Sequence, residues 1–247
     1  MDAVKIDENE YNNKTLSDIV KSNFKAAIVF EKYKLDFCCK GNKLLSDACT
    51  EKGVNEDEIL TELRGIEAFQ NSSINYEEWS LDFLIDYIVN THHSYVRKMV
   101  PIISEHVNKV ATVHGKNHPE MEDVARIFGV VYKDLKQHMM KEEEILFPHI
   151  KYLVKSKGNG NNVESPYFGS VKNPIRLMEA EHSSAGDELF EIRRLSDNYT
   201  IPEDACNTFR ITLQELKEFE EDLHKHVHLE NSILFPKSIS LESELTN

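Results

Sequence analysis

Most of the chain repeats its apolar positions every three or four residues, which is the pattern of helices with one buried face. Beyond residue 75 the pattern runs through four long stretches, at about residues 80–112, 120–154, 173–197 and 202–235. Residues 15–69 indicate several shorter helices instead. The pattern predicts an all-α protein, in which an antiparallel four-helix bundle follows a small N-terminal helical domain.

Polar and glycine-containing segments separate these stretches. The run at 71–75 predicts the domain boundary, with the small domain at 1–75 and the bundle at 76–247. A longer run at 157–169 predicts a loop between the second and third long helices. Pro101 is expected to kink the first long helix or mark a local irregularity, and Pro148 and Pro236 are expected to kink or end the second and fourth.

The second and fourth stretches carry the same motif, H-x-x-x-E-x-x-I-L-F-P, which begins at His138 and again, 88 residues later, at His226. The two copies place Glu142 and Glu230 in register. Histidine and glutamate four residues apart lie one turn apart on the same helix face. Two further glutamates follow Glu142 and offer alternatives to it, but only Glu142 matches the second copy.

A lone histidine followed by serine stands in each of the other two stretches, at His93 and at His182, 89 residues apart. Periodicity alone would place either His92 or His93 on a buried face, and the match to His182 favours His93. The bundle is therefore expected to contain two equivalent halves, each with one lone histidine and one His/Glu pair.

These histidines and glutamates fall inside the apolar stripes, where an unpaired carboxylate is costly. A single His/Glu pair at this spacing is more often a surface pair, so it is the duplication that favours a site. Imidazole and carboxylate together suit iron, manganese or zinc, and six ligands for two ions leave coordination positions open. The expected metal ligands are His93, His138, Glu142, His182, His226 and Glu230.

Other histidines and cysteines are expected to lie outside the site. His224 and His228 are interpreted as solvated neighbours of His226, and Cys49 and Cys206 as buried thiols. The remaining histidines are interpreted as structural or surface residues: His106, His114, His118 and His149.

Two adjacent cysteines, Cys38 and Cys39, form the second unusual feature. Adjacent cysteines rarely bond to each other, because the small ring strains the peptide. Thiols near the start of a helix and beside Lys40 would be activated, which favours a redox pair, a transient metal or cluster ligand set, or thiols that react with nitric oxide. Two small buried residues are the plainer alternative.

Composition narrows the classes of partner. The formal net charge of −14 argues against nucleic acid and against anionic membrane surfaces. No secretory signal and no apolar run long enough to span a membrane is present in the sequence, and four cysteines do not suggest a disulfide framework. The expected location is the cytoplasm.

With these motifs in place, the sequence resembles the repair-of-iron-centres family of iron–sulfur cluster repair proteins. The resemblance spans nearly the whole chain: D-F-C-C-K-G at 36–41, both H-x-x-x-E-x-x-I-L-F-P copies, and M-E-A-E-H at 178–182. It differs from oxygen-carrying hemerythrins, which carry more histidine ligands and an H-x-x-x-x-D motif. Lys40 also stands where some members of the family carry glycine.

The resemblance implies a hemerythrin-like bundle that holds two non-haem iron ions, with an oxo bridge as one form of the centre. It implies the six ligands already named, repair of clusters damaged by nitric oxide or oxidative stress, and Glu181 as a carboxylate on an access path. Expected partners are damaged iron–sulfur proteins or the cluster-assembly machinery, with nitric oxide or oxygen as small ligands. A nitric-oxide reductase and a sensor of nitric oxide or oxygen are the alternatives, and the resemblance leaves a homodimer open.

Overall fold

The computed structural model describes residues 11, 13–22, 26–37, 41–67, 75–159 and 163–246. The chain divides into two compact units, Met1–Trp79 and Ser80–Asn247. Regular structure in the described ranges is helical, with one isolated β-bridge between Thr15 and Leu44. The expected all-α fold, a bundle with a small helical domain before it, is confirmed.

Four short helices build the first unit, and they are α1 (Leu16–Ser22), α2 (Ala26–Lys32), α3 (Leu45–Lys52) and α4 (Glu56–Glu67). Thr15 begins α1 with a reciprocal cap. Its hydroxyl accepts from Asp18 N–H at 3.0 Å, and the Asp18 carboxylate accepts from Thr15 N–H at 3.3 Å. Phe30, Phe37 and Ile59 are fully buried and supply the apolar contacts that hold the helices together.

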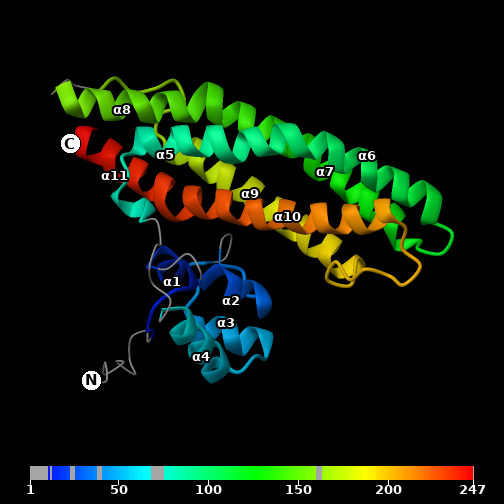
Figure 1. The fold of residues 1–247 in the computed structure, drawn as a ribbon. Helices are drawn as coiled ribbons and strands as arrows, with labels where there is room; N and C mark the ends of the chain where they lie inside the picture. The colour runs from blue at the N-terminus through cyan, green and yellow to red at the C-terminus, as the bar shows by residue number, and fades with distance from the viewer. Residues whose placement is uncertain are drawn as a thin grey trace. The chain divides into compact units, whose positions relative to one another are not determined.

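The second unit is a bundle of four long helical rods that lie side by side (Figure 1). A 3₁₀ turn, η1 (Tyr76–Glu78), precedes it. Three of the rods are each interrupted by a π turn. The rods are α5 (Leu81–Ile88), η2 (Val89–His93) and α6 (Ser94–His114); α7 (Glu120–Lys141), η3 (Glu142–Leu146) and α8 (Phe147–Asn159); α9 (Lys172–Leu195); and α10 (Asn207–Leu229), η4 (Glu230–Leu234) and α11 (Phe235–Thr246).

The helices continue past all three prolines, so the helix end that was one of the two expected outcomes at Pro148 and Pro236 does not occur. The fourth rod continues past Pro236 to Thr246, the second continues past Pro148 to Asn159, and α6 contains Pro101. In both motif copies the phenylalanine N–H donates to the carbonyl five residues earlier. Proline follows this phenylalanine in both copies and has no N–H to donate, and the helix nevertheless continues beyond it.

The fourth rod also begins later than predicted, at Asn207 instead of 202.

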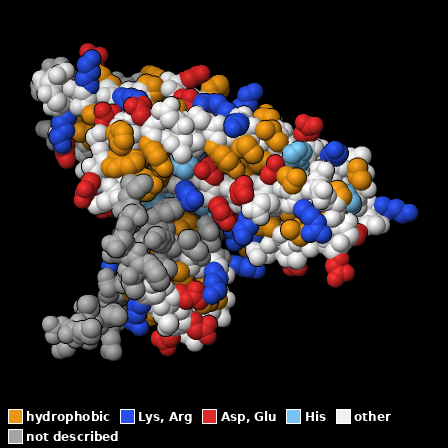
Figure 2. Space-filling model, in the orientation of Figure 1, with side chains coloured by type: hydrophobic (Ala, Val, Ile, Leu, Met, Phe, Trp, Pro, Cys, Tyr) orange, Lys and Arg blue, Asp and Glu red, His pale blue; other side chains and the backbone are white. Residues whose placement is uncertain are grey.

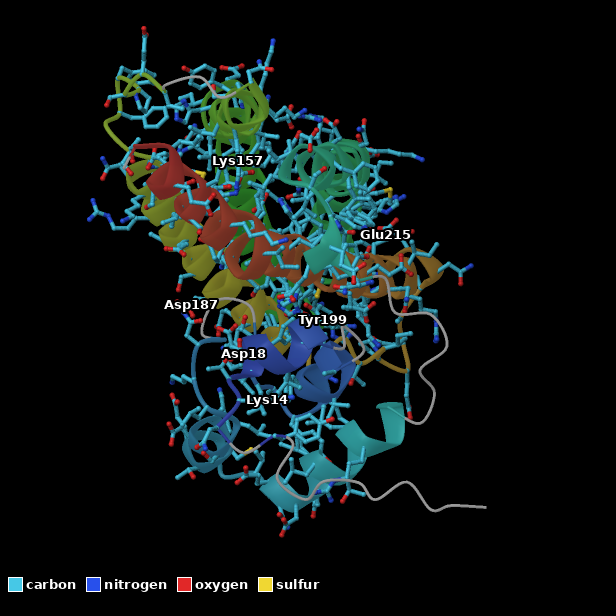
Figure 3. All side chains as sticks on the ribbon, turned by 90° about the vertical axis from the view of Figure 1, so that its left-hand side faces the viewer. Lys14, Asp18, Lys157, Asp187, Tyr199 and Glu215 are labelled. Atoms are coloured by element: carbon cyan, nitrogen blue, oxygen red, sulfur yellow. The ribbon has the colours of Figure 1, made fainter. Side chains whose placement is uncertain are left out.

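The C-terminal end of the fourth rod is bonded to the start of α9, because the Glu242 carboxylate accepts from Val171 N–H at 2.9 Å and from the Ser170 hydroxyl at 2.5 Å. Lys157 of α8 donates to Glu244 of α11 at 2.5 Å, and its label lies between these helices in Figure 3. These contacts fix one end of the bundle.

A buried polar network fixes the turn after α9. Arg193 donates through Nε to both carboxylate oxygens of Glu220, at 3.1 and 2.9 Å, and the Tyr199 hydroxyl donates to Glu220 at 2.7 Å. Asp197, Asn198 and Tyr199 all have left-handed backbone conformations, with φ of 47°, 57° and 59°. Such conformations cost energy for residues other than glycine, so the network compensates local strain.

Candidate metal centre

The six residues expected from the sequence meet inside the bundle. His93 ends η2, Glu142 begins η3, Glu230 begins η4, and His182 lies within α9. π turns recur at functional sites, because the extra residue per turn redirects neighbouring side chains. Three of the four rods therefore change register where they contribute to the cluster. All six side chains are buried, with exposures of at most 3 %.

The four imidazoles are arranged as two facing pairs. Nε2 of His93 lies 3.1 Å from Nε2 of His226, and Nε2 of His138 lies 3.0 Å from Nε2 of His182. The ring centroids are 4.8 Å apart in the first pair and 4.6 Å apart in the second. Each pair combines one histidine from each sequence half, so the duplicated halves complete each other.

Glu142 offers one carboxylate oxygen to each imidazole pair. Its Oε2 lies 3.4 Å from Nε2 of His93, and its Oε1 lies 3.3 Å from Nε2 of His138.

Glu230 repeats this arrangement from the opposite rod. Its Oε1 lies 3.0 Å from Nε2 of His226, and its Oε2 lies 3.2 Å from Nε2 of His182. Two sets of two nitrogens and two oxygens result, with both carboxylates shared between them. In each set the ligand atoms lie within 4.8 Å of one another.

Several of these atoms lack hydrogen-bond partners although they are buried. Both carboxylate oxygens of Glu142, Oε2 of Glu230 and Nδ1 of His226 are in this state. Leaving such groups unsatisfied costs about 1–3 kcal/mol each, and more when they are charged. Cations between the carboxylates and imidazoles would satisfy them, so the residues present fit a metal cluster.

Without a metal ion, the glutamates and histidines of the cluster shift one another's pKa values. Burial by itself would raise the pKa of Glu230, yet the imidazoles of His226 and His182 hold this pKa well below its usual range. Burial opposes charge on His138 as well, but Glu142 and Glu181 raise the pKa of His138 to about 10. Burial lowers the pKa of His226 despite the nearby Glu230. Metal binding at His138 would therefore compete with the proton that the two carboxylates favour on this imidazole.

Three of the four histidines are oriented by a polar group on their outer side. Nδ1 of His138 lies 2.9 Å from Oε2 of Glu181, and Nδ1 of His182 lies 2.9 Å from Oδ1 of Asn231. Glu181 also accepts from Lys141. The hydrogen bond from His138 lowers the pKa of Glu181 to about 2, and Lys141 adds to this effect. Outer partners of this kind fix the tautomer and the ring orientation of a metal-binding histidine.

Glu143 plays the same part for His93, and sequence reasoning missed it. Its Oε1 lies 2.6 Å from Nδ1 of His93 and also accepts from Arg97. The sequence had treated this residue only as a substitute for Glu142. A signal was present, since a carboxylate next to a ligand can reach an imidazole on a neighbouring helix. Glu143 also lines a surface pocket of about 370 Å³ between α6 and α7.

Two further histidines are buried in the bundle, and one of them differs from its expected surroundings. His228 is buried, with an exposure of 1 %, although the sequence placed it on a solvated flank. His92 is buried too, and it stacks on His226 at a centroid distance of 5.7 Å and an interplanar angle of 7°. Its Nδ1 lies 2.9 Å from Oδ1 of Asp222, so it supports the cluster from outside.

One of the two cysteines that were expected to be buried is exposed in the structure. Cys49 is buried as predicted, but Cys206 is exposed, which corrects that prediction. Cys38 and Cys39 lie outside the described residues. Their expected chemistry therefore stays a prediction.

Fold and site together define an all-α, four-rod bundle of the cation-binding class, with His/Glu pairs facing its interior. Residues 84–238 match the model of the hemerythrin HHE cation binding domain, a range that contains all six clustered residues. Residues 12–67 match ScdA_N, a domain of unknown function (DUF542). None of the helices in the described part of the chain is long and apolar enough to cross a membrane.

Curated relatives extend the likeness to the whole chain. The iron–sulfur cluster repair protein YtfE of Yersinia pestis (strain Pestoides F) is 33 % identical over 230 residues, which cover 93 % of this chain and 98 % of the relative. YtfE of Yersinia pseudotuberculosis serotype IB (strain PB1/+) shows the same identity and coverage. The chain belongs to this family of hemerythrin-domain iron–sulfur cluster repair proteins, which confirms the resemblance drawn from the sequence.

Proposed function

We propose that this chain holds two iron ions inside its bundle and uses them to repair damaged iron–sulfur clusters. The observation that carries the proposal is the sharing of Glu142 and Glu230 between two imidazole pairs. One ion would bind His93 and His226 with one oxygen from each glutamate. The second would bind His138 and His182 with the other two oxygens.

The types of donor atom in the cluster support a centre from which iron can be transferred to another protein. It consists of imidazole nitrogens and carboxylate oxygens only, and thiolates are the ligands that build iron–sulfur clusters. Four protein ligands for each ion leave coordination positions open, as in metal sites that react. Bound iron would supply both the metal for rebuilding a cluster and a centre for redox chemistry. The names of the curated relatives support the same activity for this chain.

A route for iron is supported on each side of the cluster. Glu143 contacts His93 inside and lines the surface pocket outside, and its side chain is 26 % exposed. Glu181 contacts His138 and is 29 % exposed. Carboxylates that touch both a ligand and solvent would hand a cation between the surface and the interior. The recipients would be damaged iron–sulfur proteins, in the cytoplasm.

Reconstitution of a damaged enzyme tests the proposal. The iron-loaded protein is mixed, without oxygen, with a purified [4Fe–4S] enzyme whose cluster has been degraded by nitric oxide, and its activity is followed. Wild-type protein should restore activity in proportion to the iron it carries, whereas the double variant His138→Ala, Glu142→Ala should not. His106→Gln is the matched control. His106 lies on the same rod as His93, but its side chain pairs with Glu215 of α10 and is not a candidate ligand. Equal rescue by the double variant would refute the proposal.

A further inference from the structure

A second group of side chains of the types that ligate metals lies at the end of the bundle formed by the end of α6 and the starts of α7 and α10. His114 ends α6 and His118 lies in the loop before α7, while Asp204 and Cys206 precede α10. His114 is 21 residues beyond His93, which is about 30 Å along a helix. The group is therefore separate from the central cluster. Histidine side chains reach the surface toward this end in Figure 2.

The four side chains meet as two pairs across the two segments. Nε2 of His114 lies 3.2 Å from Sγ of Cys206, and Nε2 of His118 lies 3.0 Å from Oδ1 of Asp204. Ligands bound at about 2.0–2.3 Å to one tetrahedral ion lie roughly 3.3–3.7 Å from one another. Both pairs therefore already have almost the separation of two neighbouring ligands on one ion.

The two pairs stand beside each other on a common support. The rings of His114 and His118 both pack against Phe209, at centroid distances of 5.2 and 5.1 Å. The ring centroids of His114 and His118 are 6.4 Å apart, whereas those of the two imidazole pairs in the central cluster are 4.8 and 4.6 Å apart. The four ligand atoms would therefore have to move closer together to surround one ion, at a place where Cys206 is exposed and Asp204 is 54 % exposed.

His118 also has the outer partner that metal-binding histidines use. Its Nδ1 lies 3.0 Å from Oε1 of Glu120, which leaves Nε2 directed at the group. The hydrogen bond with Asp204 raises the pKa of His118, and Glu120 adds to this. A carboxylate behind an imidazole fixes the ring and strengthens its metal bond. In the central cluster Glu181 stands in the same relation to His138.

We propose that His114, His118, Asp204 and Cys206 form a second metal site, for one zinc-like divalent cation. Two imidazoles, one thiolate and one carboxylate suit a borderline-soft ion in tetrahedral coordination. The sequence pattern is H-x-x-x-H followed by D-x-C. The thiolate separates this site from the central one, whose six candidate ligands include no sulfur. Binding would join the loop before α7 to the segment before α10.

Cobalt(II) titration tests the proposal, because a thiolate–cobalt bond gives a charge-transfer absorption that nitrogen and oxygen ligands do not. The protein is first loaded with iron. It also carries Cys38→Ser and Cys39→Ser, so that Cys206 is the exposed thiol to which the absorption band responds. One equivalent of cobalt per chain should produce the band, and zinc should displace it. Adding Cys206→Ser should abolish the band, whereas adding Cys49→Ser should leave it unchanged.

Further variants test the other ligands. His114→Gln and Asp204→Asn should each weaken cobalt binding at least about tenfold, and Glu120→Gln by roughly 10–100-fold. Glu122→Gln, also in the first turn of α7, is the control and should have no effect. Circular dichroism should show unchanged helix content in every variant. Absence of the band, its persistence without Cys206, or cobalt affinity unaffected by His114→Gln and Asp204→Asn would each overturn the proposal.

Discussion

Glu142 and Glu230, 88 residues apart in the chain, face each other in the bundle and divide their oxygens between the same two imidazole pairs. Each carboxylate is fully buried, and each begins a π turn. Neither of the two proposed metal positions would be complete without both residues. The two halves of the sequence repeat therefore do not form two separate groups, since each half supplies candidate ligands to both.

Glu143 should control iron affinity although it is not itself a proposed ligand. Glu143→Ala removes the carboxylate behind His93, so we expect iron affinity to fall by roughly 10–100-fold. Glu144→Ala is the matched control, because Glu144 is the exposed neighbour of Glu143. Competition with a chromophoric chelator measures both affinities. Equal affinities in the two variants would contradict a positioning role for Glu143.

The two adjacent arginines at the end of α9 should differ sharply in their effect on stability. Arg193→Ala leaves the buried Glu220 carboxylate without its cation and should lower the free energy of unfolding by about 3 kcal/mol. Arg194 forms a surface pair with Glu191, so Arg194→Ala should cost less than about 0.5 kcal/mol. Urea unfolding of the iron-loaded proteins measures both. Similar losses for the two variants would contradict the buried network.

His149 should contribute to acid destabilisation. Burial lowers the pKa of His149, despite the Glu242 carboxylate nearby. The unfolded chain therefore binds this proton more readily than the folded one, and stability falls as pH drops below the unfolded pKa of about 6.5. His149→Gln should reduce the loss of stability between pH 7.5 and pH 5, measured by urea unfolding. An unchanged loss would contradict this assignment.

The six clustered residues were predictable because the signal is a repeat. A helix face is fixed by spacing, so H-x-x-x-E at His138 and His226 determines which side chains share a face. Two copies in register then indicate one interior. The choice of His93 over His92 rested on the same repeat. In the structure both are buried, but only His93 joins a group of candidate ligands.

The π turns could not be predicted, because periodicity of three and four residues assumes a constant register. The proline that ends each motif was expected to kink or end its helix, whereas each helix continues beyond the π turn and the proline. Contacts between rods were also out of reach. The position of Glu143 beside Glu142 allowed a contact with another helix but did not identify His93 as the partner, and no local pattern indicated the contact between Cys206 and His114.

The iron-to-chain ratio of protein loaded with ferrous iron under anaerobic conditions, and then freed of loosely bound metal, tests the central claim most directly. The account predicts two iron ions per wild-type chain. Glu142→Ala should lose both, because this carboxylate serves both positions, whereas His93→Ala should lose mainly one. A wild-type ratio of one or less, or a Glu142→Ala variant that keeps one ion at full affinity, would contradict the shared-carboxylate centre.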